Sequence, residues 1–463
     1  MKTSKFAKII ALISIFILTT IVWSCDDVKE YPIATDNIPP GKVTSVEVEN
    51  LHGGAMITYT LPPDNDVMGV KAVYSFYEGG TEYEMFSSAF RDTIILAGYP
   101  DANEHIVNLY TLDNSRNLSE PVPVTIHPLT PPVDLIRQSL KLNETFGGVY
   151  LQWENIMEEN IAISLYVDSI GEMELDDTYF SNATNGSFSF RGFPNQTLAF
   201  KVEIRDRWMN YSLPLDTVLT PLFEQQIRGR NEAGMQMWNL WGVNNQECIS
   251  RGDNWATIGG SPLVNFGMLF DDILYDAGNW WHLGDDSGFL KHFIPGWPSD
   301  DNTYAWPVYM SFDMGRSAVY SRFKAFARAR NPDFSAPMFM AIELWGTDNP
   351  KPLVPELTDE DRLTNLRYWT SWPEAQGTDE WKNDWSLLGD FTVSLPSGAT
   401  LSSDALTAED IQFIRNGFDF EISPDKSNIP CRYLRFIIKR SNLIGGRPGT
   451  QMGELQFFGS YTD

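Results

Sequence analysis

One pattern occurs twice in the first half of the chain. A Gly-Gly pair precedes alternating apolar and polar residues at Gly53 and again at Gly147, a spacing of 94 residues. A motif Asp-x-x-x-Asn-x-Ser-x-Pro begins at Asp113 and at Asp206, a spacing of 93 residues. Alternation with period two is typical of half-buried β-strands. Strands and a turn that recur at nearly the same distance indicate two tandem modules with one fold.

The two modules cover residues 41–128 and 129–222, and a Leu-Thr-Pro occurs near the end of each. Units of this size, with short β-branched and aromatic strands, are typical of β-sandwiches. The repeat resembles fibronectin type III-like domains, in which an Asp-to-Asn turn joins the last two strands. We therefore expect two tandem β-sandwiches. We interpret Asp113 and Asp206 as turn formers, because Asp and Asn side chains bond the local backbone, and not as catalytic acids.

Tryptophan becomes frequent from Phe223 onward: 12 of the 15 Trp residues lie between Trp238 and Trp385. Only 357–367 and 407–415 show a helical pattern in this part. Short β-type segments between Gly, Pro, Asn and Asp loops predict strands at 305–314, 320–328, 338–344, 385–392, 432–439 and 454–458. Residues 223–463 are therefore expected to form a third all-β domain, long enough for a decorated jelly roll.

Five short motifs in the third domain follow the order seen in discoidin, or coagulation-factor type C, jelly-roll domains. They are Met310–Gly315, Met340–Gly346, Trp385–Gly389, Arg432–Phe436 and Gly453–Gly459. The whole chain resembles Bacteroidota surface lipoproteins that combine tandem fibronectin-like modules with a C-terminal discoidin-like domain. Such proteins are encoded in polysaccharide-utilisation loci, beside TonB-dependent transporters and their glycan-binding lipoprotein partners. The resemblance implies glycan capture at the cell surface.

The N-terminus has the pattern of an export signal. Three lysines precede an apolar run from 9 to 23 that is too short for a comfortable membrane span. Val22-Trp-Ser-Cys25 resembles the lipobox of bacterial lipoproteins, which implies cleavage after residue 24 and a lipid on the Cys25 thiol; an ordinary secretory signal is the alternative. The following acidic residues resemble a tag for the outer face of the outer membrane. Residues 25–40 contain three Pro and are interpreted as a tether.

Composition excludes one class of partner. The formal charge is −27, and it becomes −30 without residues 1–24 and their three Lys. So acidic a surface disfavours nucleic acid, because binding there depends on neutralising phosphates. No stretch after residue 24 is long and apolar enough to cross a bilayer. Besides Cys25, the chain has Cys248 and Cys431, which can form a disulfide in an oxidising compartment or remain two buried thiols.

Loops rich in tryptophan supply the candidates for ligand contact. Sugars present an apolar face of C–H groups, so their recognition calls for an exposed aromatic ring flanked by hydrogen-bonding groups. The loops before 305–314 and the insertion after 357–367 provide both. The candidate glycan-binding residues are Trp280, Trp281, His282, Trp297, Trp306, Trp369 and Trp372. The alternative for each Trp is packing beneath a loop or in the core.

A structural Ca²⁺ is the one cofactor that the discoidin-like resemblance implies. Its oxygen ligands would be Asp271, in an Asp-rich loop, and Glu454, in the last strand motif. The five His and the two remaining Cys show no zinc-type spacing.

A run of alternating cations predicts a basic strand face. Arg322, Lys324, Arg328 and Arg330 share parity along one extended segment. This face either meets an anionic glycan or is a solvated face that balances nearby acids.

Three functions fit these features. The first is an outer-membrane lipoprotein that binds oligo- or polysaccharide through residues 223–463, held away from the membrane by the two modules. The second is a protein-binding adhesin or an assembly subunit of a surface transport complex. The third is a glycoside hydrolase or lyase, which needs paired carboxylates across a cleft. Acidic runs such as 359–361 are typical of solvated turns, so we predict a binding protein and not an enzyme.

Overall fold

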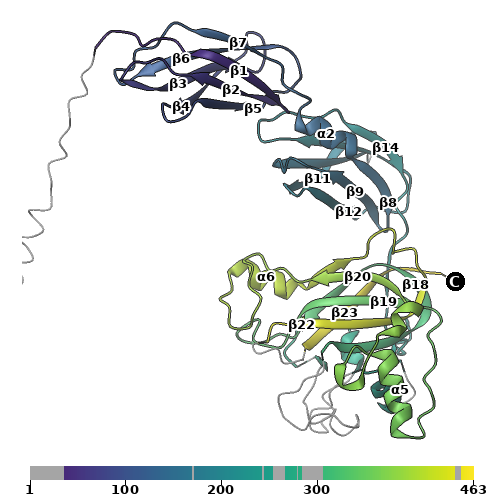
Figure 1. Cartoon of the computed structure of the whole chain (residues 1–463). Helices are drawn as coiled ribbons and strands as arrows, with labels where there is room; N and C mark the ends of the chain where they lie inside the picture. The colour runs from purple at the N-terminus through teal and green to yellow at the C-terminus, as the bar shows by residue number, and fades with distance from the viewer. Residues whose placement is uncertain are drawn as a thin grey trace, which may run out of the picture.

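The computed structural model describes residues 36–168, 171–241, 245–253, 266–278, 280–283, 306–443 and 450–462. These residues form mainly β-strands, in three domains that follow one another along a curved line (Figure 1). The predicted all-β class is therefore confirmed. None of the helices in these ranges has the length and apolar character needed to span a membrane. Cys25, with the export signal and most of the predicted tether, lies outside the described residues.

The first domain is a sandwich of two antiparallel sheets. One sheet has the order β1 (Thr44–Leu51), β2 (Gly54–Thr60), β5 (Thr93–Ala97). The other has the order β4 (Glu82–Ser88), β3 (Val67–Ser75), β6 (His105–Asp113), β7 (Val122–Ile126). Alternate residues of these strands, such as Ile57, Val70 and Leu109, are buried between the sheets, as the period-two pattern predicts.

The second domain repeats this arrangement strand for strand. Its three-stranded sheet has the order β12 (Asn185–Arg191), β9 (Gly148–Glu154), β8 (Lys141–Thr145). Its four-stranded sheet has the order β11 (Met173–Ser181), β10 (Ile161–Asp168), β13 (Leu198–Arg205), β14 (Leu215–Leu219). A short helix, α2 (Pro132–Ser139), begins the domain. The prediction of two tandem β-sandwiches is confirmed.

The repeated Asp-x-x-x-Asn motif forms the same turn in both sandwiches. Asp113 Oδ1 accepts the main-chain N–H of Asn117 at 2.7 Å, and Asp206 Oδ1 accepts that of Asn210 at 2.9 Å. Each Asn amide also donates to its Asp Oδ2, at 2.9 Å in both turns. The Asn210 amide donates further to the main-chain oxygen of Gly98 in the first domain, at 3.0 Å. The turn residues therefore stabilise the local chain, and the second turn also joins the two sandwiches.

The third domain is built on a nine-stranded sheet. Its main order is β15 (Gln225–Ile227), β23 (Thr450–Tyr461), β18 (Val308–Ala327), β22 (Cys431–Ser441), β19 (Phe339–Thr347), β20 (Ser386–Thr392). The shorter strands β16 (Asn239–Leu240) and β21 (Phe418–Glu421) pair with β18, and β17 (Trp281–Leu283) pairs with β23.

Strand β18 unites two segments that the sequence predicts as separate strands. Its first part pairs with β22 and its second part mainly with β23, and the pairing with β22 shifts between Asp313 and Ala318. Gly315 lies at this break with φ of 79°, a left-handed conformation that glycine adopts at little cost. The glycine allows one strand to serve both parts of the sheet.

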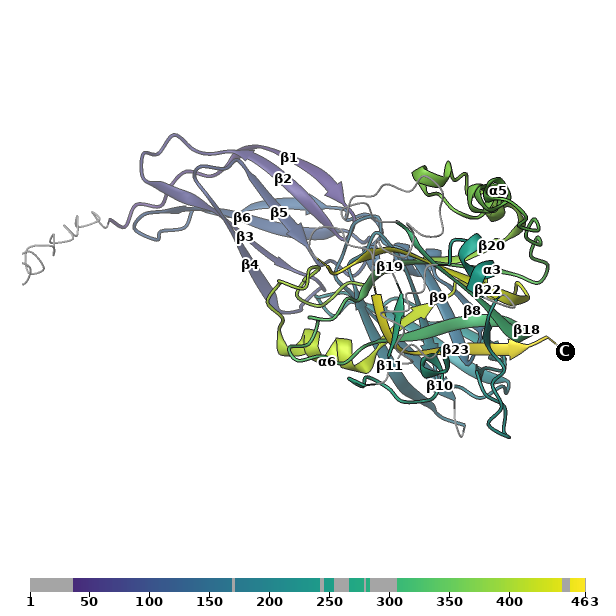
Figure 2. The ribbon, with the colours of Figure 1, turned by 90° about the horizontal axis from the view of Figure 1, so that it is seen from below.

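Two helices in the third domain begin with a capping box, in which a Thr and an Asp three residues later bond each other's backbone. Thr358 caps α5 (Asp359–Trp369) and Thr407 caps α6 (Ala408–Asn416), close to the predicted helical segments. These helices lie on opposite sides of the domain (Figures 1 and 2). In the described part of this domain the other helical pieces are α3 (Asn245–Ser250), η1 (Phe266–Leu269), η2 (Pro373–Ala375) and η3 (Glu380–Asp384).

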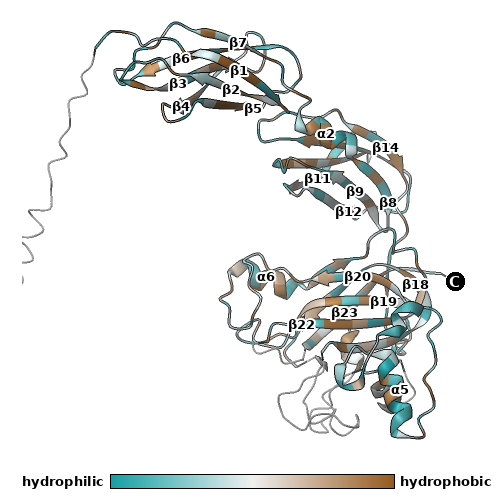
Figure 3. Ribbon diagram, viewed as in Figure 1, coloured by the Kyte–Doolittle hydropathy of each residue, from teal (hydrophilic) through white to brown (hydrophobic). Residues whose placement is uncertain are grey.

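Both faces of the central strands are covered. On one face, alternate residues such as Met310 and Leu434 belong to the main core of the domain. On the other face, Tyr309 and Ile437 belong to a second apolar cluster, which the insertion at 348–385 supplies with Leu366 and four Trp. Helix α5 is mostly hydrophilic (Figure 3), and Asn365, Leu366 and Trp369 are its buried residues. The insertion therefore covers the outer face of the sheet.

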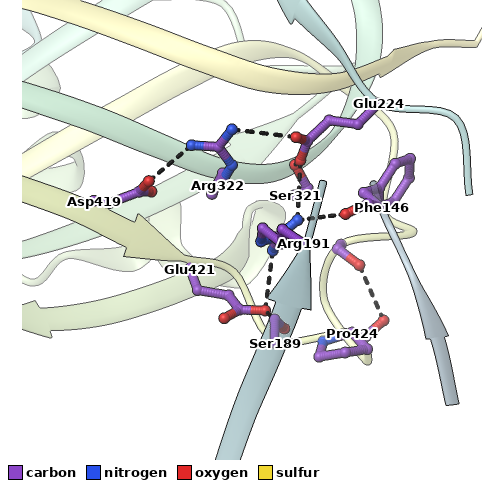
Figure 4. Close-up of polar contacts among 10 residues, drawn as sticks. Phe146, Ser189, Arg191, Glu224, Ser321, Arg322, Asp419, Glu421 and Pro424 are labelled. Carbon is purple, nitrogen blue, oxygen red and sulfur yellow. Dashed lines mark hydrogen bonds and ion pairs between the residues drawn. The ribbon is translucent and has the colours of Figure 1, made fainter. Parts of the chain in front are cut away.

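A chain of five alternating charges joins the second and third domains (Figure 4). Arg191, at the end of β12, donates to Glu224 and to Glu421, at 3.0 Å each. Arg322 on β18 donates to Glu224 at 3.2 Å and to Asp419 at 2.8 Å. Arg322 opens the predicted basic face, so this part of the face serves the joint between domains.

Candidate functional site

Arg435 lies at the centre of the outer face of the sheet, on β22, and its side chain is 0% exposed. Its guanidinium donates to Asp253 Oδ1 at 3.2 Å and to Ser311 Oγ at 2.7 Å. It also donates to the main-chain oxygens of Arg251 and Trp369, at 2.7 and 2.8 Å. A buried cation requires such pairing, because water no longer solvates it. The network attaches residues 251–253 and the end of α5 to the sheet.

Aromatic rings enclose the same guanidinium. Its carbon lies 4.5 Å from the ring centroid of Tyr309, 4.8 Å from that of Trp381 and 5.4 Å from that of Trp369. A cation over an aromatic face is attracted by the ring quadrupole, and more strongly when water is excluded. Much of the tryptophan in the insertion is therefore used to cover a buried charge.

Burial corrects the assignment of three predicted ligand-binding residues. Trp281, Trp369 and Trp372 are each only 1% exposed. Trp281 belongs to the main core, while Trp369 and Trp372 belong to the outer aromatic cluster. Trp372 also donates its indole N–H to the main-chain oxygen of Pro307 at 2.9 Å. A sugar cannot stack on rings that other side chains already cover, so these residues hold the domain together.

The other predicted contact residues have different positions. Trp280 is half-buried, and the guanidinium of Arg328 lies 3.9 Å from its ring centroid. Trp306 is half-buried and packs against the main core. The main chain of His282 pairs with Gln451, while its side chain lies outside the described part of the structure, as does the whole of Trp297. The side chains of Trp280 and Trp306 are thus only partly exposed to solvent.

A cleft with a volume of 490 Å³ opens beside the aromatic cluster. Its lining consists of Trp241, Glu247, Ser250, Arg251 and residues 352–356. Trp241 is half-buried, and its ring packs edge-on against Trp369 with the centroids 5.4 Å apart. The guanidinium of Arg251 lies 4.1 Å from the centroid of the Trp241 ring. The cleft therefore has an aromatic wall that other rings and a cation hold in place.

The cleft is also lined by segment 352–356, which α5 holds in place. Asn365, 2% exposed, donates its amide to the main-chain oxygen of Val354 at 2.9 Å and accepts the Val354 N–H at 2.8 Å. Arg362 donates to Glu356 at 3.2 Å. These three bonds fix segment 352–356 before any ligand arrives, which lowers the entropy that binding would cost.

A smaller hollow of 200 Å³ lies against the same segment, and Pro352 and Val354 line both hollows. Its other lining residues include Tyr368 and Lys351, whose ammonium lies 4.1 Å from the centroid of the Tyr368 ring. Together the hollows present aromatic surface, carboxylate acceptors and cationic donors over a short distance. Such a surface suits a ligand with many hydroxyl groups and an apolar face.

The two predicted calcium ligands do come together. Glu454 is 1% exposed and accepts the main-chain N–H groups of Asp271 at 3.2 Å and Asp272 at 3.3 Å. Burial raises the pKa of Glu454 to about 8. The carboxylate oxygens of Glu454 are thus occupied by N–H donors, whereas a calcium site would place further oxygen ligands around the same point. In the described ranges no group of three or more His, Cys, Asp or Glu residues could hold a metal. The pair alone does not make a calcium site, and calcium binding stays a prediction.

The disulfide prediction is wrong, because Cys248 and Cys431 are two buried free thiols. Cys248 on α3 donates to the main-chain oxygen of Trp241 at 3.8 Å. Cys431 on β22 belongs to the main core, where burial raises its thiol pKa to about 12. A neutral thiol is easily buried as a small apolar group, so the second alternative offered by the sequence is the correct one.

Three family models match parts of the chain, and each is described as a domain of unknown function: DUF4959 at residues 40–128, DUF5126 at 129–229 and DUF5000 at 291–459. No curated protein matches the chain. Each model covers less than half of the 463 residues. The models therefore divide the chain without assigning it an activity.

Several solved structures are similar to parts of the chain. A SusE-like protein is 23% identical, with a TM-score of 0.37, over 72% of this chain and all of its own. The C-terminal domain of a chitobiase from Bacteroides fragilis is 13% identical, with a TM-score of 0.26, over 49% of this chain and 96% of its own. A two-domain fibronectin type III segment of chicken tenascin is 14% identical, with a TM-score of 0.21, over 39% and 99%. Similarities at this level do not bear on function.

Sequence reasoning missed Trp241 as the aromatic wall of the cleft. The residue lies at the start of the tryptophan-rich part, but no turn or motif separates it from its neighbour Trp238, which is 3% exposed in the main core. Its position depends on Arg251 and on the insertion more than 100 residues later. A local sequence signal for it does not exist.

Proposed function

We propose that this protein is a surface-exposed, lipid-anchored outer-membrane protein that binds glycan through its third domain and assists polysaccharide capture for uptake. The observation that carries the proposal is the cleft beside Trp241, whose lining includes this aromatic ring, two carboxylates and the fixed segment 352–356. The lipobox-like sequence at Cys25 supports the anchor. The arrangement of modules, through its resemblance to proteins of polysaccharide-utilisation loci, supports a TonB-dependent transporter and its glycan-binding partner as neighbours.

The binding mode follows from the chemistry of the cleft. The C–H face of a sugar ring packs on Trp241, while its hydroxyl groups donate to Glu247 and Glu356. No bond is made or broken. A modest affinity is sufficient, because an anchored protein raises the local concentration of oligosaccharide next to a transporter.

Affinity electrophoresis of residues 26–463 through gels that contain single polysaccharides tests this proposal. We expect one glycan to retard the protein. Trp241→Ala should weaken retention at least about fivefold, since lost aromatic packing costs about 1 kcal/mol or more. Glu247→Gln keeps the shape of the cleft and should also weaken retention. Trp280→Ala removes a half-buried Trp away from the cleft and serves as the matched control.

Two outcomes contradict the proposal. One is the absence of retention on a broad panel of neutral and charged polysaccharides, which together with tight capture of a neighbouring surface protein would favour an adhesin or assembly subunit. The other is retention that Trp280→Ala abolishes and Trp241→Ala leaves intact. Thermal melting of each variant distinguishes loss of a contact from loss of the fold. Release of shorter oligosaccharides from any glycan would indicate an enzyme instead.

A further inference from the structure

Three residues stand side by side across the four-stranded sheet of the second domain. Ala162 on β10 lies opposite Phe180 on β11 and opposite Arg205 on β13. The neighbours of Ala162 along the strand, Ile161 and Ile163, belong to the core. Side chains alternate along a strand, so Ala162 points to the outer face, and its two partners flank it there.

A small side chain between two large ones leaves a groove. Strands lie about 4.8 Å apart, so Phe180 and Arg205 rise from positions about 10 Å apart, with only a methyl group between them. The groove has a volume of 440 Å³ and includes Asn160, Asn182 and Arg207 in its lining. Phe180 is 69% exposed, while Ala162 on the floor is 3% exposed. The width suits a single sugar ring between an aromatic wall and a cationic wall.

The two arginines of the groove have no carboxylate partner among the described residues. Among the described residues neither Arg205 nor Arg207 forms an ion pair. Arg205 donates to the main-chain oxygen of Asp206 at 3.4 Å, and the Arg207 guanidinium lies 4.0 Å from the ring centroid of Trp208. The Asp206 carboxylate is occupied by its turn, where it accepts the N–H groups of Trp208 and Asn210. Two unpaired cations beside each other are a distinctive feature in a chain with a formal charge of −27.

The first domain lacks this groove, although it has the same fold. Gly69 takes the place of Ala162 and lies opposite Ser88 and Leu112, so the row contains neither an aromatic nor a cationic wall. The ring of Phe86 lies across the floor instead: a Cβ on Gly69 would come within 2.6 Å of it. The two modules therefore share the sandwich and differ in the surface at this row.

We propose that the groove of the second domain is a separate binding site for an anionic saccharide, one that carries a uronic acid or a sulfate group. The C–H face of the ring packs on Phe180, the exposed wall of the groove. The anionic group accepts hydrogen bonds from Arg205 and Arg207, which suit carboxylate and sulfate oxygens. The amides of Asn160 and Asn182 bind hydroxyl groups. This site goes beyond the cleft of the third domain and does not depend on it.

Isothermal titration calorimetry of residues 26–463, the mature chain without its lipidation site Cys25, tests the proposal with defined probes. Tetragalacturonate carries carboxylates, a carrageenan tetrasaccharide carries sulfates, and fully methyl-esterified tetragalacturonate is the neutral counterpart of the first. We expect saturable binding of one anionic probe, and binding of the neutral probe at least about tenfold weaker. Tetraglutamate, an acidic peptide, tests whether charge alone is recognised.

Two variants in the groove and two controls outside it locate the site. Arg205→Gln should weaken binding about tenfold, as expected for a charge-assisted hydrogen bond, and Ala162→Leu should abolish it by filling the floor. Arg116→Gln removes one charge from the corresponding turn of the first domain and should leave binding unchanged. Trp241→Ala should also leave it unchanged, which separates this site from the cleft of the third domain.

The proposal is overturned if neither anionic tetrasaccharide binds, or if tetraglutamate binds as tightly as the saccharides. It is also overturned if Arg205→Gln and Ala162→Leu, both folded by thermal melting, bind like the unmodified protein.

Discussion

Burial decides what each aromatic and charged side chain of the third domain can do. Trp369 and Arg435 are residue types that often bind ligands, but here they contact each other inside the domain. The guanidinium carbon of Arg435 lies 5.4 Å from the centroid of the Trp369 ring. Trp241 belongs to the same cluster and yet lines a cleft, because it sits at the edge of the cluster. The same residue type therefore has a structural role at the centre of the cluster, and at its margin it has the binding role that we propose for Trp241.

Arg435→Met should lower the free energy of unfolding of the third domain by about 3–5 kcal/mol, because it leaves the Asp253 carboxylate buried with one partner fewer. Urea unfolding followed by tryptophan fluorescence measures the change. Arg432→Met is the matched control: Arg432 pairs with Asp313 but is 43% exposed, so its loss should cost about 1 kcal/mol or less. Equal losses in the two variants would show that the buried network does not hold the insertion in place.

Among the elements, helix α6 shows how local and distant bonds combine. Asp410 completes the capping box with Thr407, whose N–H it accepts at 2.8 Å. The same carboxylate accepts the N–H of Ser397 at 2.9 Å, which ties the helix to the loop before it. The capping box is readable in the sequence, whereas the bond to Ser397 depends on how the loop folds.

The stability that Asp410 contributes should disappear at acid pH. Burial opposes ionisation, yet hydrogen bonds from Ser397 and Thr407 lower the pKa of Asp410 from 3.8 to about 2. A carboxyl with a lowered folded-state pKa stabilises above its unfolded pKa and loses this contribution as pH falls through the folded value. The difference in melting temperature between the unmodified protein and Asp410→Asn should therefore shrink from about pH 4 to about pH 2.

Glu409→Gln provides the comparison for this measurement. It removes a carboxylate from the same helical turn, but not the hydrogen bonds of the capping box. A difference for Asp410→Asn that stays constant over the same pH window would contradict the assignment.

Over the whole molecule, side chains at the joints fix how the three domains follow one another. Asn210 of the second domain forms a hydrogen bond to the first domain, and the ion pairs of Glu224 with Arg191 and Arg322 join the second domain to the third. Few residues separate β14 from β15, so the third domain has little free linker. The contacts at the joints therefore limit how the domains move relative to one another.

Arg191→Met should loosen the joint between the second and third domains, because it leaves Glu224 and Glu421 without this shared partner. Small-angle X-ray scattering of the mature chain should show a broader distribution of interatomic distances. Raising the salt concentration to 1 M should have a weaker effect in the same direction, since part-buried pairs are only partly screened. Arg415→Met, which breaks an ion pair with Asp333 away from the joint, should leave the scattering unchanged.

The candidate sites could be predicted from the sequence only in part. Asp271 and Glu454 were expected to hold Ca²⁺ together; the structure brings the two residues together through the main-chain N–H of Asp271, 3.2 Å from Glu454 Oε2, and calcium binding stays a prediction. Trp281, Trp369 and Trp372 were expected in loops, and they are buried. The groove of the second domain escaped notice, because Ala162, Phe180 and Arg205 are neighbours only through strand register. The discoidin-like identity of the third domain and the lipid on Cys25 stay predictions.

The sequence by itself determined the tandem sandwiches and the capped helices, because a repeated pattern, a strand period and a capping box are set by residues close together in the chain. Only the tertiary structure decided which tryptophans face solvent and which cysteines stay apart. Along β18 and β22, successive side chains point alternately to the two faces of the sheet. Which face meets water depends on the insertion at 348–385, and here its aromatic residues cover the second face.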